Sequence, residues 1–219
     1  MELYPDQDWW ESHSVEWPRR KCSEIVNGFR DLVDKNPPER EIQSYITKFP
    51  WILAEQFPHC HFIFPQFRLG SNYVADFVAP EKCSGGAVYY FVEIEQAGHS
   101  LMTKSGKFTA PVRNAVEQVQ EWRRWIIENY EYVKRDRSKN GLGLHDLTRY
   151  IVGKVYIGRR SNQNDRFNEL RQTLLEQSSI DICSYDRMIE WAAYRANFWD
   201  GYDAQFADGR FIPRYDEQV

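Results

Sequence analysis

The chain has 219 residues, of which 42% are hydrophobic and 16% aromatic, so it can bury a substantial core within one domain of ordinary size. Its formal net charge of -4 argues against non-specific binding of polyanions by the whole surface, but it leaves room for a local basic face. Its four cysteines lack CxxC spacing, which indicates reduced thiols. Its N-terminus is unlike a signal peptide, and no apolar run approaches the roughly 18 residues of a membrane span. We therefore expect a cytoplasmic protein with no membrane partner.

Residues 1–35 are expected to form an N-terminal extension with one helix. The beginning of this extension shows no clear period and contains Trp9, Trp10 and Trp17. These indoles are candidates for a surface that binds a second copy of the chain or a sensing partner. The following stretch, KCSEIVNGFRDLVDKNPP, spaces its apolar side chains as a helix does and ends in two prolines.

A second helix is predicted over residues 39–49, EREIQSYITKF, and Pro50 ends it. Glu41 lies one turn before Tyr45, at the edge of the apolar stripe of this helix. Two interpretations remain open for Glu41. It either faces the interior of a site, or it is a solvated acid that the helix dipole favours in the first turn.

Three strands follow, with short connections that indicate an antiparallel meander. They are predicted in HFIFPQFRLG (61–70), YVADFVAP (73–80) and AVYYFVEIEQ (87–96). Strict alternation along the second strand would place Asp76 on one face and its neighbours Ala75 and Phe77 on the other.

The rest of the chain alternates between helices and strands. A polar loop leads to a long helix over 112–135, whose apolar side chains recur at three and four residues. A near-continuous apolar strand over 148–160 is expected at the centre of the sheet. A helix (164–177), a short strand (180–186), a last helix (187–200) and a C-terminal tail (201–219) complete the chain. This order predicts an α/β fold in which helices flank a mixed sheet, an antiparallel meander plus central strands.

The stretch YYFVEIEQAGHS places Glu93 and Glu95 on the same face of the third strand. If the second and third strands pair as a hairpin, Asp76 faces Glu93 across the ladder. Three carboxylates around one point suit a hard divalent cation, Mg²⁺ or Mn²⁺, which removes their mutual repulsion. The alternative is that one of the two glutamates lies exposed at a strand edge and pairs with a lysine or arginine.

The order of an in-strand Asp, an ExE strand and a helix containing QVQEWRRW resembles the PD-(D/E)XK nuclease superfamily. More narrowly, it resembles the nuclease domain of the Shedu anti-phage defence proteins, over about residues 38–190. The segments that carry the resemblance include EIQSYITKFPWIL, VADFVAP, FVEIEQAG, LMTKSGKFT, AVEQVQEWRRWI, YIGRR and IDICSYDRMIEW. It implies a restriction-endonuclease-like domain over 36–200 and a metal-dependent endonuclease or nickase that acts on DNA in anti-phage defence.

The resemblance also implies roles for individual residues. Asp76 and Glu93 match metal ligands, and Gln118 matches a helix Gln that reaches toward the metal or the phosphate. Glu41 matches a first-helix acid that contacts the metal through water. Glu95 stands where the superfamily usually has a lysine.

The replacement of that lysine by Glu95 leaves two outcomes open, because an ionised glutamate offers neither positive charge nor a hydrogen-bond donor. Glu95 either serves as an extra ligand while Lys104 or Lys107 supplies the charge, or the site has lost catalysis. The second outcome makes the protein a nucleic-acid or DNA-end binding module. A third interpretation is an interaction domain assembled through the N-terminal tryptophans.

Four arginines are candidates for contacts with a phosphate backbone. Arg123 and Arg124 lie on the long helix, and Arg159 and Arg160 follow the central strand. The alternative for these side chains is that they are solvated or pair with local acids.

Overall fold

The computed structural model describes residues 6–18, 21–84 and 86–206. Of the C-terminal tail expected over 201–219, the first six residues continue the last helix, and the rest lies outside the described residues. Within the described part of the chain, no helix is both long and apolar enough to cross a bilayer.

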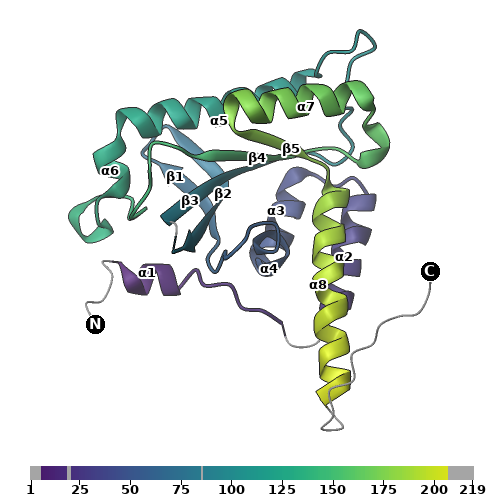
Figure 1. Cartoon of the computed structure of the whole chain (residues 1–219), viewed down its shortest axis with the longest axis horizontal. Coiled ribbons are helices and arrows are strands. Elements are labelled where there is room, and N and C mark those ends of the chain that lie inside the picture. The colour runs from purple at the N-terminus through teal and green to yellow at the C-terminus, as the bar shows by residue number, and fades with distance from the viewer. Residues whose placement is uncertain (1–5, 19–20, 85, 207–219) are drawn as a thin grey trace.

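A five-stranded mixed sheet forms the centre of the molecule (Figure 1). Its strands run in the order β1-β2-β3-β4-β5, with β1, β2 and β3 antiparallel and with β3, β4 and β5 parallel. The predicted mixed sheet with an antiparallel meander is therefore confirmed, and β4 is internal as expected, but β5 lies at an edge. The strands are β1 (Phe64–Leu69), β2 (Tyr73–Cys83), β3 (Gly86–Ile94), β4 (Val152–Tyr156) and β5 (Ile180–Cys183).

Helices cover both faces of this sheet (Figure 1). On one face α5 and α7 pack over a core that includes Val78 and Phe91. On the other face α2, α3, α4 and α8 enclose a second core with Phe77 and Val92. The helices are α1 (Gln7–Glu11), α2 (Cys22–Asp34), α3 (Glu39–Lys48), α4 (Trp51–Ala54), α5 (Ala110–Glu128), α6 (Tyr130–Lys134), α7 (Asp165–Ser178) and α8 (Tyr185–Phe206), with 3-10 turns at Arg137–Lys139 and Arg160–Asn162.

The long helix predicted over 112–135 is interrupted at Asn129, which separates α5 from α6. The side-chain Nδ2 of Asn129 donates a hydrogen bond of 2.9 Å to the carbonyl of Trp125. An Asn that bonds a nearby backbone group in this way competes with regular helix geometry. The prediction of a single helix was wrong for this reason.

The N-terminal tryptophans Trp9 and Trp10 pack against the chain itself. The indole of Trp10 is buried and donates a hydrogen bond to the carbonyl of Gly143. The ring of Trp9 lies 4.5 Å from that of Phe64 on β1. Both therefore extend the core on the α5 side of the sheet.

Candidate metal centre

The pairing of β2 with β3 places Asp76 across from Glu93. The registered pair of Phe77 with Val92 sets these two acids opposite each other one residue further along the ladder. Both carboxylates are buried, with 9% of Asp76 and 6% of Glu93 exposed. Two adjacent buried acids without a cation are an unfavourable arrangement, because each ionised form destabilises the other.

The backbone of β2 is irregular at Asp76. We expected Ala75 to share a face with Phe77, but Ala75 packs in the core on the α5 side, together with Val78. The register places Asp76 opposite Gln66, whose φ of 48° departs from strand geometry. The alternation of side chains therefore shifts at Asp76.

Three donors hold the carboxylate of Asp76. Its Oδ1 accepts hydrogen bonds from the side-chain amides of Gln43 at 2.5 Å and Gln66 at 3.1 Å. Its Oδ2 accepts a bond of 2.9 Å from the backbone N–H of Ile94. Burial raises the pKa of Asp76, and these three hydrogen bonds oppose that rise because they favour the ionised form.

Glu93 has the most unfavourable surroundings of the acids in this region. Burial raises its pKa strongly, and the charges of Asp76, Glu95 and Glu39 raise it further. A hydrogen bond from Gln118 on α5 acts in the opposite direction. The Oε2 atom of Glu93 is buried and has no hydrogen-bond partner. A buried, unpartnered carboxylate oxygen among other acids is a position that a cation would satisfy.

Two further acids complete what we call the acid cluster, which consists of Glu39, Asp76, Glu93 and Glu95. Burial, followed by the charges of Asp76 and Glu95, raises the pKa of Glu39 on α3 to about 7. Burial and the charge of Asp76 raise the pKa of Glu95. The backbone of Glu95 is fixed, since its N–H donates to Tyr156 and its carbonyl accepts from the Tyr185 hydroxyl.

Helix α3 presents Glu39 to the acid cluster, and not the sequence-predicted Glu41. Glu39 and Gln43 are four residues apart and therefore lie on one face of the helix. Glu41 is exposed on another face and lines a shallow surface pocket with Arg40 and Lys48. The sequence alone does not distinguish the two acids, because the contact of Gln43 with Asp76 that identifies this face appears only in the structure.

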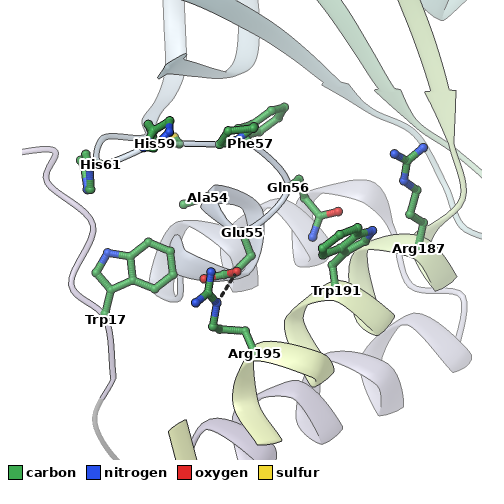
Figure 2. A pocket seen from close by; sticks show the side chains of 12 residues that line it. Trp17, Ala54, Glu55, Gln56, Phe57, His59, His61, Arg187, Trp191 and Arg195 are labelled. Atoms are coloured by element: carbon green, nitrogen blue, oxygen red, sulfur yellow. Dashed lines mark hydrogen bonds and ion pairs between the residues drawn. The ribbon is translucent and has the colours of Figure 1, made fainter. Parts of the chain in front are cut away.

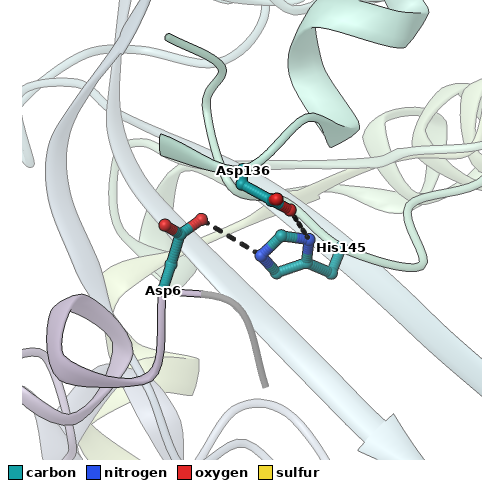
Figure 3. Close-up of side chains that lie close together, drawn as sticks. All are labelled: Asp6, Asp136 and His145. Atoms are coloured by element: carbon teal, nitrogen blue, oxygen red, sulfur yellow. Dashed lines mark hydrogen bonds and ion pairs between the residues drawn. The ribbon is translucent and has the colours of Figure 1, made fainter. Parts of the chain in front are cut away.

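The acid cluster fits a divalent cation by the chemistry of its donors, since carboxylates are the ligands that Mg²⁺ and Mn²⁺ prefer. The ligand atoms of the cluster, however, do not lie within 4.8 Å of one another. Among the described residues, the one group that brings three ligand atoms within 4.8 Å of one another is Asp6, Asp136 and His145 (Figure 3). Asp76, Glu93 and Glu95 would have to draw closer to share one ion.

The Asp6–Asp136–His145 group is explained without a metal. His145 Nε2 lies 3.1 Å from Asp6 Oδ2, and its Nδ1 lies 3.8 Å from Asp136 (Figure 3). Asp6 also accepts a hydrogen bond from the backbone N–H of Arg137, and Lys139 pairs with Asp136 at 2.6 Å. These contacts connect the start of α1 to the turn at Arg137–Lys139, which gives the group a structural role.

The structure does not bring Lys104 or Lys107 into contact with the acid cluster. Both are exposed, in a turn closed by hydrogen bonds between Thr103 and Lys107. Within the described residues, the basic side chain at ion-pair distance from the cluster is that of His99, whose Nε2 lies 3.7 Å from Glu95 Oε2. The ion pairs of the described residues thus bring no lysine to the acid cluster.

Three of the four candidate phosphate-binding arginines form hydrogen bonds within the chain. Arg159 pairs with Asp186 and Asp34, and Arg160 forms two hydrogen bonds with Glu190. Arg123 donates to the carbonyl of Ile151. The fourth, Arg124, is exposed and lies 3.9 Å from Glu121. This pattern agrees with the alternative interpretation, in which the arginines pair with local groups.

Residues 36–189, well over half of the chain, match the family model described as Shedu protein SduA, C-terminal. The matched region contains the whole acid cluster and Gln118. No curated protein matches the chain.

Proposed function

The chain belongs to the family of the Shedu protein SduA C-terminal region, which is linked to anti-phage defence, and from this premise we propose that it is a metal-dependent DNA endonuclease or nickase. The order of Asp76, Glu93 and Glu95 along the sheet, which resembles that of the PD-(D/E)XK nucleases, supports this assignment. We further infer that the mixed sheet is of the restriction-endonuclease type.

The single observation that carries the proposal is the unpartnered, buried Oε2 of Glu93 within the acid cluster. Asp76, Glu93 and Glu95 would hold the cation, with Glu39 next to them. When bound, Mg²⁺ or Mn²⁺ would lower the pKa of a water molecule and neutralise charge on a phosphodiester.

The protein's own groups position this site and exchange protons in it. Gln43 and Gln66 orient the carboxylate of Asp76, and Gln118 orients that of Glu93. Glu39 has a pKa of about 7 in the metal-free protein, and a bound cation would lower that pKa and keep the carboxylate ionised, which suits a general base.

Cleavage of a supercoiled plasmid tests the proposal. We expect Mg²⁺ or Mn²⁺ to support the formation of open circles and EDTA to stop it. Asp76→Asn should slow the reaction by at least about 100-fold, because removal of a charged metal ligand removes transition-state stabilisation. Cleavage that persists in EDTA, or that Asp76→Asn performs at the wild-type rate, would refute the metal-dependent site.

A nucleic-acid binding module without turnover is the second candidate function. The observation that favours it is that the four acids of the cluster have no lysine among their ion pairs within the described residues. Such a lysine would supply the positive charge that stabilises the transition state. Folded protein that binds DNA but cleaves it with neither metal would establish this alternative.

A further inference from the structure

A cavity of about 490 Å³ lies on the surface between the loop after α4 and the helix α8 (Figure 2). Its walls include Trp17, the segment 54–61 and three side chains of α8. No member of the acid cluster lines it. The cavity is therefore separate from the proposed metal centre, and the proposed nuclease activity does not explain it.

Helix α8 presents an unusual stripe to this cavity. Arg187, Trp191 and Arg195 follow one another at intervals of four residues, so they share one face of the helix (Figure 2). The indole of Trp191 is 51% exposed, although a large aromatic side chain gains by burial. An open aromatic ring between two guanidinium groups suits a ligand that has both a flat ring and a negative charge.

The guanidinium of Arg195 is only partly engaged. Its Nε donates a hydrogen bond of 2.8 Å to Oε2 of Glu55, whose side chain is just 6% exposed (Figure 2). This bond uses one nitrogen of a group that has five N–H donors. Glu55 thus fixes the position of Arg195 without exhausting its donors.

The charge of Arg187 is only partly neutralised by its surroundings. Its Nη1 lies 3.5 Å from Oδ2 of Asp181. The same carboxylate is already bound by Lys154 at 2.6 Å and by Arg171 at 2.7 Å. Asp181 therefore neutralises the charge of Arg187 only in part, and of these three cations Arg187 is the one that lines the cavity, where it can attract an anion.

We propose that this cavity binds a nucleotide, with the base stacked on Trp191 and the phosphate bound by Arg187 or Arg195, which lie one helical turn before and after that indole. The volume matches a small-molecule site, and aromatic stacking combined with arginine is the usual way in which proteins bind nucleotide units of a strand. The same chemistry recognises a free nucleotide and one unit of a single strand. Neither requires cleavage at the acid cluster.

Titration of the whole chain in EDTA tests the proposal separately from nuclease activity. The probes are ATP and an oligothymidylate of about ten nucleotides, and binding is followed by calorimetry. Trp191→Ala is expected to weaken the binding of at least one probe by about 5- to 150-fold, the range that stacking of one base provides. Trp191→Phe, which keeps a ring, should retain most of the affinity.

Tyr194→Ala is the matched control, because Tyr194 is a 74% exposed aromatic residue on the same helix that does not line the cavity. It should bind both probes as the wild type does. Dependence of ATP binding on Trp191 identifies a site for a free nucleotide, and the same dependence for the oligonucleotide alone identifies a strand contact. The proposal is overturned if neither probe binds the wild type, or if Trp191→Ala and Tyr194→Ala behave alike.

Discussion

Replacement of Glu93 by glutamine is expected to abolish DNA cleavage and, in the same protein, to raise the thermal stability of the metal-free fold at pH 8. Cleavage should fall by at least about 1,000-fold, because a neutral amide is a poor ligand for a hard cation. Stability should rise because the amide is neutral at every pH, so the protein avoids both the cost of protonating Glu93 on folding and the cost of burying its charge beside Asp76 and Glu95.

The sign of the stability effect follows from the raised pKa of Glu93. Because the folded state holds the proton of Glu93 more tightly than the unfolded chain does, ionisation costs stability as the pH rises above about 4.5, the ordinary glutamate pKa. The cost is absent below that pH and grows up to the folded pKa. The gain from Glu93→Gln should therefore be small at pH 4.5 and larger at pH 8.

Thermal unfolding in EDTA at the two pH values measures this gain. An effect of about 1–2 kcal/mol at pH 8 corresponds to a rise in Tm of roughly 2–8 °C for a chain of this size. Glu117→Gln is the control, since Glu117 is an exposed acid on α5 and should change neither property. A destabilised Glu93→Gln protein at pH 8, or one that still cleaves DNA, would contradict the assignment.

The second large effect is expected at the start of α3, where Glu39→Gln should slow cleavage by at least about 10-fold at pH 7 and Glu41→Gln should not. Glu39 interacts with Asp76 and Glu95, and its pKa of about 7 allows it to accept a proton near neutral pH. Glu41 lies on another face of the helix and is exposed.

Initial cleavage rates between about pH 6 and pH 9 separate these two glutamates. The wild-type rate should rise with pH as Glu39 ionises, at a pH below its metal-free pKa of about 7 because the bound cation favours the carboxylate, and Glu39→Gln should lose that rise. Glu41→Gln should follow the wild-type profile within about twofold, as surface changes commonly do. An equal loss of cleavage rate in both variants would contradict either the assignment of Glu39 to the face of α3 that meets the acid cluster or its role as a general base.

Much of the fold could be predicted from the sequence because its elements have strong periods and clear ends. The short turns between the first three strands determined the meander, and the hairpin then placed Asp76 opposite Glu93. Glu39 could not be selected by the same reasoning. Both Glu39 and Glu41 fall in the first turn, where a dipole argument favours either acid.

Other features depend on contacts between distant segments and left no local signal. Lys154 lies in a strand that looked continuously apolar, yet it pairs with Asp181 on β5 at a buried position. Gln43 and Gln66 reach Asp76 from different elements. Trp10 is buried because of a loop that is distant in the sequence and contains Gly143, which no pattern in its own segment reveals.

The location of a bound divalent ion tests the central claim most directly. Crystals soaked in Mn²⁺ should show an anomalous scattering peak between Asp76 and Glu93, beside the unpartnered Oε2 of Glu93. Mn²⁺ is suited to this purpose because it accepts the same oxygen ligands as Mg²⁺. A peak at Asp6, Asp136 and His145 with none at the acid cluster would contradict the account, because the metal would then lie away from the proposed catalytic residues.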